Sequence, residues 1–307
     1  MEKNGNSGIN DVFFLILYSN NPVCNNHPPI KNKIIETKID SPFLKKMKTL
    51  VNRYDKKLIG QLPKVLFEGR IIVIQGKEEA ARAVDYLLKQ KIIGIDTETK
   101  PVFKKGSGMN PVALLQVSTH DTCFLFRLNH IGYTDDLIRL MSDNTVLKVG
   151  LSLKDDFAQL NRRKPFTAGK HSELQAMVRE MGIIDQSLQK IYANFFGQRI
   201  SKTQQLTNWE ADVLTEAQKR YAATDAWACI QIYEEILRLD ANGYMLEIIP
   251  EPERPELPVL SEEEIEKKKQ HKEQKKKEAR KRRAIRAKAN RRKKKERTDK
   301  EKLQNIA

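Results

Sequence analysis

The stretch Ile92-Ile-Gly-Ile-Asp-Thr-Glu98 decides the fold class of this chain. Its first part, residues 92–95, is a continuous apolar run of strand length, which is typical of a strand buried on both faces. Side chains two residues apart on a strand project from the same face, so Asp96 and Glu98 point together where the apolar run ends. Strand ends are the edge at which α/β proteins place their sites. Taken alone, such a pair is also typical of a solvated loop.

On both sides of this stretch, short apolar runs alternate with amphipathic ones. The pattern of a strand recurs at residues 71–74, 112–117, 123–126 and 146–149. The pattern of a helix covers residues 78–88, 135–141, 155–160, 174–181, 187–196 and 215–239. Strands that alternate with helices and are followed by helices predict a layered α/β domain, which we place at residues 67–245.

The segments around this domain differ from it in composition. Residues 1–46 are rich in Asn, contain Pro and show no sustained period, which predicts a disordered extension. The alternative is that natural translation begins at Met47, so that this piece is not native. Residues 47–66 lead into the domain, and four prolines between 250 and 258 predict a Pro-rich linker at 246–260.

Residues 261–307 form a basic tail that carries most of the chain's charge. They contain 21 Lys or Arg and 9 Asp or Glu, a net charge of +12 out of +16 for the whole chain. With few apolar residues the tail cannot bury a core, so it is expected to be disordered or an isolated helix. Its clusters at 280–283 and 291–295 predict nonspecific nucleic-acid binding through counterion release. A solubilising role and attachment to ribosomal RNA are the alternatives.

The composition argues against several other classes of protein. Cys24, Cys123 and Cys229 are widely spaced and form no CxxC pair, so neither a disulfide framework nor a zinc site is indicated, and a cytoplasmic setting is expected. The longest apolar run, residues 12–18, is shorter than the about 20 residues that cross a membrane. No G-x-S-x-G motif is present, and no histidine lies beside a nucleophile motif, so a Ser or Cys hydrolase is not supported.

Two further segments carry acidic side chains that can join the pair on the first strand. The strand at 146–149 runs into Asp155 and Asp156 at the start of a helix. Adjacent helical residues differ by about 100° in direction, so one aspartate is expected to enter the site and the other to cap the helix. Tyr221 and Asp225, four residues apart in a helical stretch, share one face. A partly buried Tyr beside a surface Asp is the ordinary alternative.

Together these segments supply four carboxylates and a phenol. Oxygen ligands are those that hard cations such as Mg²⁺ or Mn²⁺ prefer. Two such ions about 3.5–4 Å apart clamp the attacking and leaving oxygens of an in-line phosphoryl displacement. A tyrosine with a pKa of about 10 is a poor base at neutral pH, but it can orient a water molecule by hydrogen bonding. The set is therefore sufficient for phosphoryl transfer with two divalent cations.

The order and spacing of these five residues resemble the DEDDy branch of the ribonuclease D and Werner-type 3′→5′ exonucleases: Asp96-x-Glu98, Asp156 and Tyr221-x3-Asp225. The segment from Ile200 to Ala226 is particularly similar to Werner-type exonuclease domains, and Leu114-Leu-Gln-Val117 fits the family's second strand. The resemblance covers residues 67–239 and implies a ribonuclease H-like mixed β-sheet flanked by helices. Around the domain the chain departs from both relatives, so the resemblance implies no choice of substrate.

The resemblance also implies a role for each residue of the set: Asp96 bridges both metal ions, Glu98 and Asp225 bind the ion on the nucleophile side, Asp156 holds the second ion through water, and Tyr221 aligns the attacking water. Asp156 is preferred over Asp155 because the family's aspartate lies four residues before a leucine, here Leu160.

Two residues between the helices have roles that the sequence leaves open. Lys202 is a candidate phosphate contact or an ordinary solvated lysine. Trp209 is interpreted as a structural anchor rather than a base-stacking surface. The expected function is a metal-dependent 3′→5′ exonuclease acting on DNA or RNA, and the alternative is a catalytically inactive nucleic-acid- or ribosome-binding protein of the same fold. Contacts to the 2′-hydroxyl, which distinguish the two polymers, are not assigned.

Overall fold

The computed structural model describes residues 13–16, 34–36, 47–103 and 108–251, and helical fragments of the tail at 266–267, 270–271, 273–275 and 277–278. The chain divides into two units, residues 1–249 and 250–307, and all the named elements belong to the first. The tail fragments are helical, which is one of the two states expected for this segment. Its basic clusters at 280–283 and 291–295 lie outside the described residues.

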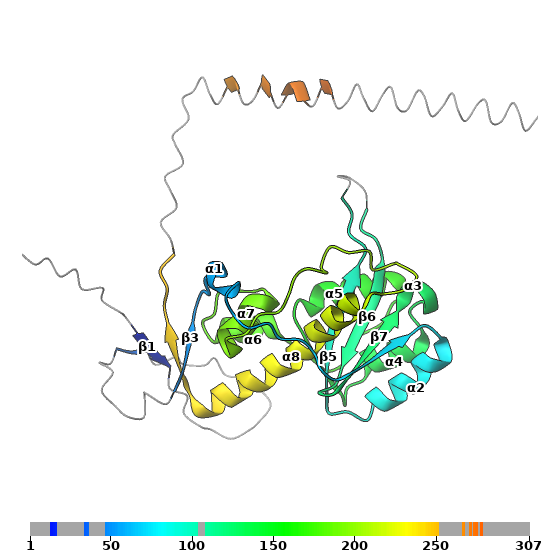
Figure 1. Ribbon diagram of the computed structural model, residues 1–307, viewed down its shortest axis with the longest axis horizontal. Coiled ribbons are helices and arrows are strands. Elements are labelled where there is room, and N and C mark those ends of the chain that lie inside the picture. Colours follow the sequence, from blue (N-terminus) through cyan, green and yellow to red (C-terminus); the bar gives the residue numbers. More distant parts are fainter. Residues whose placement is uncertain are drawn as a thin grey trace, which may run out of the picture. The chain divides into compact units, whose positions relative to one another are not determined.

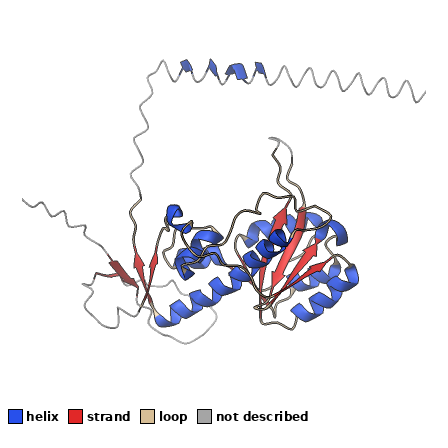
Figure 2. Cartoon of the chain, in the orientation of Figure 1, coloured by secondary structure: helices blue, strands red, loops and turns tan. Residues whose placement is uncertain are grey.

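A six-stranded mixed sheet forms the centre of the first unit, with the strand order β4-β7-β6-β5-β8-β9 (Figures 1 and 2). Its strands are β4 (Arg70–Ile74), β5 (Ile92–Thr99), β6 (Val112–Ser118), β7 (Thr122–Arg127), β8 (Leu147–Gly150) and β9 (His171–Glu173). The strand β5 lies between β6, to which it is antiparallel, and β8, to which it is parallel. The sheet is therefore mixed, as the family resemblance implies.

Helices cover both faces of this sheet (Figure 1). The helices of the first unit are α1 (Lys56–Ile59), α2 (Lys77–Leu87), α3 (Leu128–Ile131), α4 (Asp135–Ser142), α5 (Leu153–Arg163), α6 (Leu174–Glu180), α7 (Leu188–Phe196) and α8 (Glu216–Asn242). On one face, Val84 of α2, Leu137 of α4 and Leu160 of α5 share a buried core with Ile95 of β5. On the other face, the long α8 packs against Leu114 of β6. Burial on both faces explains the unbroken apolar run of β5.

A second, smaller sheet has the order β2-β1-β10-β3. It contains β1 (Phe13–Ile16), β2 (Ile34–Glu36), β3 (Lys48–Val51) and β10 (Tyr244–Glu247). Leu50 of β3 and Leu246 of β10 are buried in the same apolar cluster as Ile236 of α8. This packing ties residues 47–51 to the end of the domain, so the predicted lead-in is part of the folded unit.

The structure differs from the predicted flanks in two places. Residues 13–16 and 34–36 are in strands rather than unstructured, because β1 pairs with β10 and β2 with β1. The predicted linker begins too early, because β10 continues to Glu247. The rest of residues 1–46 lies outside the described residues, and the proposed start at Met47 stays a prediction.

Every strand and helix expected inside the domain is present, with shifts at the ends. The shift with a consequence for the site is at β5, which continues to Thr99 because it stays paired with β6 beyond residue 95. Asp96 and Glu98 therefore lie within a paired strand and not after it. The strand β9 was not expected, since His171-Ser-Glu173 has no apolar run; parallel pairing with β8 makes it a strand.

Within the described part of the chain, no helix is both long enough and apolar enough to cross a bilayer. Cys123 and Cys229 are buried and free, and Cys24 lies outside the described residues. The cytoplasmic setting that the cysteines suggest stays a prediction.

Candidate metal centre

The strand β5 presents Asp96 and Glu98 on the face that α8 covers. In the register with β6, Glu98 lies opposite Leu114, which is buried against α8. The helix approaches β5 closely at Gly94, where a Cβ atom would lie 1.9 Å from the carbonyl oxygen of Ala226. A side chain of any other residue at this position would push the helix away. The glycine therefore permits the close approach that brings carboxylates of the strand and the helix together.

The carboxylates of Asp96, Glu98 and Asp225 gather where α8 crosses β5. One oxygen atom from each lies within 4.8 Å of the other two. Asp225 is buried one helical turn beyond Tyr221, as their spacing predicts. The Oδ1 atom of Asp225 has no hydrogen-bond partner among the described residues, although it is buried. An oxygen-only cluster with an unpartnered buried oxygen fits a hard divalent cation such as Mg²⁺ or Mn²⁺.

Asp156 approaches the same strand from α5. Its side chain is buried and accepts a hydrogen bond from Oγ1 of Thr97, whereas Asp155 is exposed. Asp156 lies outside the group of three carboxylates that come within 4.8 Å of one another. Its charge nevertheless acts on Asp96, whose pKa it raises. Of the two adjacent aspartates, Asp156 is thus the one directed at β5, and its role as a metal ligand stays a prediction.

The expected role of the other aspartate as a helix cap is wrong. The N-cap residue of α5 is Ser152, which has a left-handed backbone (φ 66°) and makes no side-chain cap hydrogen bond. The backbone N–H groups of Ser152 and Leu153 donate instead to the carboxylate of Glu173, at 2.9 and 2.7 Å. Glu173 ends β9, so the pairing of β9 with β8 supplies the cap of the helix that carries Asp156.

Burial raises the pKa of every carboxyl group in the site, and repulsion between the carboxylates of the site adds to this effect at Asp96 and Glu98. Withdrawal from water is the largest cause for each of the four. Repulsion from the other three carboxylates adds to it at Asp96, whose pKa is raised well above its usual value. The pKa of Glu98 rises to about 9, and the pKa values of Asp156 and Asp225 rise to about 7. The site therefore carries its full negative charge at neutral pH only when positive charge is bound beside it.

Tyr221 joins the carboxylates through its hydroxyl group, which donates a hydrogen bond to Asp225. Burial, followed by the charges of Asp225 and Glu98, raises the pKa of this phenol far above its usual value, so it stays protonated at neutral pH. The centre of its ring lies 6.0 Å from that of Trp209. Trp209 is fully buried, which confirms its interpretation as an anchor and leaves no face for stacking on a base.

A cavity of about 260 Å³, which we call the carboxylate cavity, adjoins these groups. Five of the six residues predicted for the site line it: Asp96, Glu98, Lys202, Tyr221 and Asp225. Lys202 is exposed, and its charge acts with the Tyr221 hydrogen bond to lower the pKa of Asp225 against the effect of burial. The sixth, Asp156, reaches the site by way of Thr97.

The sequence analysis did not predict two residues that shape the site, Thr97 and Glu173. Thr97 lies inside the Asp-x-Glu motif, so its position was visible in the sequence but its bond to Asp156 was not. Glu173 carries no local signal at all, because its partners Ser152 and Leu153 come from another element.

Known proteins were compared with this chain by sequence and by fold. A model of the 3′-5′ exonuclease family matches residues 71–239. Exonuclease 3′-5′ domain-containing protein 2 of Drosophila melanogaster is 33% identical over 152 residues, which are 48% of this chain and 26% of that protein. The bifunctional 3′-5′ exonuclease/ATP-dependent helicase WRN of Mus musculus is 28% identical over 151 residues, or 47% of this chain and 11% of that protein.

Among solved structures, the Nibbler EXO domain of Aedes aegypti has a TM-score of 0.51 and is 21% identical, covering 61% of this chain and 90% of that one. At 21% identity, this similarity shows a shared fold and says nothing further about function. The matched region spans only about a quarter of the Drosophila protein, so the similarity does not extend to the activity of that whole protein.

Proposed function

The chain belongs to the DEDDy-type 3′-5′ exonuclease family, and we propose that it hydrolyses phosphodiester bonds at the 3′ end of DNA or RNA with the help of two divalent cations. The observation that carries this proposal is the cluster of Asp96, Glu98 and Asp225, whose oxygen atoms come within 4.8 Å of one another. Such crowding of negative charge is costly without a bound cation, and here it adjoins an open cavity.

The residues of the chain would divide the work between holding cations and placing reactants. Asp96, Glu98 and Asp225 offer a carboxylate oxygen each, and Asp156 adds a fourth carboxylate beside them. Bound Mg²⁺ or Mn²⁺ would supply the positive charge that polarises the phosphodiester and activates water. Tyr221, whose raised pKa keeps its proton in place, orients the attacking water by hydrogen bonding rather than acting as a base.

Among the described residues that line the carboxylate cavity, Lys202 is the cationic one, and its charge lowers the pKa of Asp225 against the effect of burial. We assign to it a contact with a phosphate oxygen of the substrate strand, a role for which a lysine serves as a point charge. The metal clamp and the placed water act on any 3′-terminal phosphodiester, so these groups serve DNA and RNA alike.

The test is degradation of 5′-labelled single-stranded DNA and RNA by the purified full-length protein, with Mg²⁺, with Mn²⁺ and with EDTA. We expect a ladder of shortened 5′-labelled products with either metal and none with EDTA. The Asp96→Ala variant should lose at least about 10³-fold in rate, because several ligands act as one unit. The relative rates on the two strands identify the polymer.

A catalytically inactive binding protein of the same fold is the competing function. It predicts that wild-type protein binds the labelled strands but leaves them intact with both metals, and that Asp96→Ala changes nothing. The presence of all four carboxylates and of Tyr221 favours the enzyme, since a site without catalysis has no need to keep such mutually repelling groups.

A further inference from the structure

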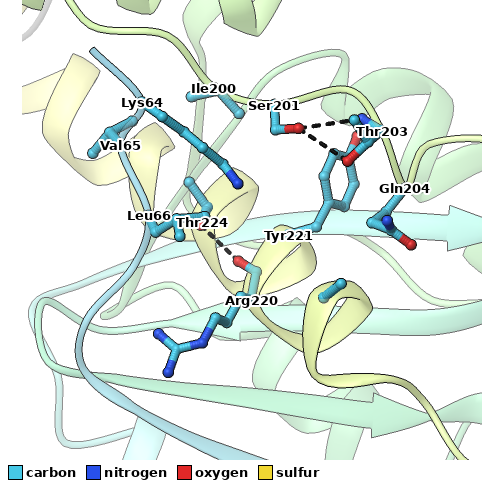
Figure 3. A pocket seen from close by; sticks show the side chains of 11 residues that line it. Lys64, Val65, Leu66, Ile200, Ser201, Thr203, Gln204, Arg220, Tyr221 and Thr224 are labelled. Atoms are coloured by element: carbon cyan, nitrogen blue, oxygen red, sulfur yellow. Dashed lines mark hydrogen bonds between the residues drawn. The ribbon is translucent and has the colours of Figure 1, made fainter.

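A second cavity, of about 240 Å³, lies beside the carboxylate cavity (Figure 3). Both cavities are lined by Ile200, Ser201 and Tyr221, so they are neighbours that share these three residues. We call the second one the Lys64 cavity. A polymer chain held at the carboxylates has this cavity next to it.

The two cavities differ sharply in charge. Three carboxylates line the first, whereas none of the residues that line the second is acidic. In Figure 3 the Lys64 side chain extends toward Thr224 and Tyr221, while Arg220 leaves the helix in another direction. In the described part of the chain, Lys64 takes part in no salt bridge. Its ammonium group is therefore available to an anionic ligand.

The surface that lines the Lys64 cavity is mainly apolar, with aliphatic side chains beside the polar residues Ser201, Thr203, Gln204 and Thr224. Val65 and Leu66 come from the segment before β4, Ile200 from the loop before α8, and Ala217 from the first turn of α8. A mainly apolar wall that is flanked by the cations Lys64 and Arg220 suits a ligand that is apolar on one side and anionic on the other. A nucleotide has this character, since its base can pack against aliphatic side chains while its phosphate meets the lysine.

The segment that carries Lys64 is held firmly in place. The N–H group of Val65 donates to the carbonyl of Arg199 at 3.0 Å, and the N–H group of Arg199 donates to the carbonyl of Pro63 at 2.9 Å. The Nε atom of Arg199 also donates to the carbonyl of Leu62, at 2.9 Å. These bonds attach residues 62–65 to the loop that supplies Ile200. Residues 64–66 lie before the part of the chain that matches the family model, residues 71–239.

We propose that the Lys64 cavity binds the nucleotide immediately 5′ of the scissile phosphodiester, with Lys64 contacting the phosphate at the 5′ side of that nucleotide. The inference rests on the proposed exonuclease activity. In the proposed reaction, the scissile phosphate lies beside the metal ions that the carboxylate cavity would hold. The next phosphate of the strand then needs a site beyond Tyr221 that has no acidic groups. The Lys64 cavity is such a site, and it adjoins Tyr221.

The experiment compares two dinucleotides that differ only in a 5′-terminal phosphate. Wild-type protein should cleave the 5′-phosphorylated dinucleotide with a KM about three- to tenfold lower than the unphosphorylated one. Lys64→Ala should remove this preference, leaving kcat and the KM of the unphosphorylated dinucleotide unchanged. Lys57→Ala is the matched control, because Lys57 is an exposed lysine on α1 that lines neither cavity. A Lys64→Ala protein that keeps the full preference overturns the proposal.

A second variant tests the apolar wall. Ala217→Phe places a ring in the Lys64 cavity from an exposed position on α8, so the fold should tolerate it. We expect it to raise the KM of both dinucleotides with an unchanged melting temperature. An unaltered KM in a protein with an unaltered melting temperature counts against the site.

Failure of the exonuclease proposal has a separate signature. If wild-type protein cleaves neither dinucleotide, calorimetric titration of the Asp96→Ala variant with both dinucleotides still examines the cavity. Tighter binding of the phosphorylated one, lost on adding Lys64→Ala, supports the site without the activity; equal binding of both rejects the site.

Discussion

Asp96 is the carboxylate whose pKa is raised by all three other carboxylates of the site. Its carboxylate is repelled by Asp156, Asp225 and Glu98, and withdrawal from water adds a still larger penalty to its ionisation. Natural proteins keep such arrangements where function requires them, at a cost in stability. The same repulsion makes the metal-free protein sensitive to pH, because protonation relieves it.

The first prediction concerns that sensitivity. A carboxyl group whose pKa is raised on folding stabilises the folded state most at low pH, and this contribution is lost as pH rises from the unfolded to the folded pKa. For Asp156 and Asp225 the window runs from about 4 to about 7, and for Glu98 it extends to about 9. In EDTA, the urea concentration at the unfolding midpoint should therefore decrease as the pH is raised from 5 to 8.

Mg²⁺ provides the control for this prediction. It competes with protons for the carboxylates, so it should raise the urea midpoint more at pH 8 than at pH 5. A midpoint that rises with pH in EDTA, or a Mg²⁺ effect that is larger at pH 5, contradicts the account of the charges.

The second prediction concerns Tyr221. Replacement by Phe removes the hydroxyl group that bonds Asp225 but keeps the ring that packs near Trp209. We expect kcat to fall about 10²-fold, as for loss of a positioned proton donor or acceptor, with the Mg²⁺ dependence of the rate unchanged. Steady-state rates at several Mg²⁺ concentrations and a melting curve measure this. Full activity in Tyr221→Phe would exclude the role of the hydroxyl in placing water.

At the scale of elements, the site depends on how α8 and α5 meet β5. Gly94 lets α8 approach closely enough for Asp225 to reach the strand carboxylates. On the α5 side, Glu173 of β9 accepts hydrogen bonds from two N–H groups at the start of the helix. Each helix is thus positioned by a residue that carries none of the proposed chemistry.

The third prediction tests the contact from β9. Glu173→Ala leaves the N–H groups of Ser152 and Leu153 without an acceptor, which should lower the free energy of unfolding by about 1–2 kcal/mol. Because Asp156 lies in the first turns of α5, the Mg²⁺ concentration for half-maximal rate should also rise. Urea denaturation and Mg²⁺ titration of the rate measure the two effects.

Asp155→Ala is the matched control, since this exposed carboxylate lies on the same helix and caps nothing. It should change the unfolding free energy by less than about 0.5 kcal/mol. Equal effects of the two substitutions would show that the capping bonds of Glu173 do not position α5.

At the scale of the whole molecule, the chain consists of a unit that carries the site, residues 1–249, and a strongly charged unit, residues 250–307. The second contains 21 Lys or Arg from residue 261 onward. Phosphate contacts made by such a segment add affinity that falls steeply with salt and is independent of sequence.

The fourth prediction is that removal of residues 250–307 separates binding from cleavage. Because the site lies entirely in residues 1–249, the shortened protein should keep its melting temperature and its kcat. Its affinity for long single strands should fall. The slope of the logarithm of the binding constant against the logarithm of the salt concentration should become less steep by about 0.7 for each lost phosphate contact. Fluorescence anisotropy at several salt concentrations measures both. Unchanged affinity and salt dependence would leave the tail with a solubilising role only.

The sequence by itself predicted the elements of the sheet and the residues that we assign to the proposed site, because both carry local patterns. Apolar runs and helical periods marked the strands and helices of residues 67–245, and the i, i+2 and i, i+4 spacings put carboxylates on common faces. The resemblance to exonucleases chose Asp156 over Asp155, and the burial of Asp156 agrees with that choice.

Only the tertiary structure decided how these residues are held. The extension of β5 to Thr99, the cap from Glu173 and the wall carried by Lys64 each depend on partners far away in the sequence. Hydrogen bonds and packing between distant segments give no periodic pattern in the residues that make them. His171-Ser-Glu173, for example, is a strand because it pairs with β8. The residues of the proposed chemistry could therefore be predicted from the sequence, whereas the contacts that hold them in place could not.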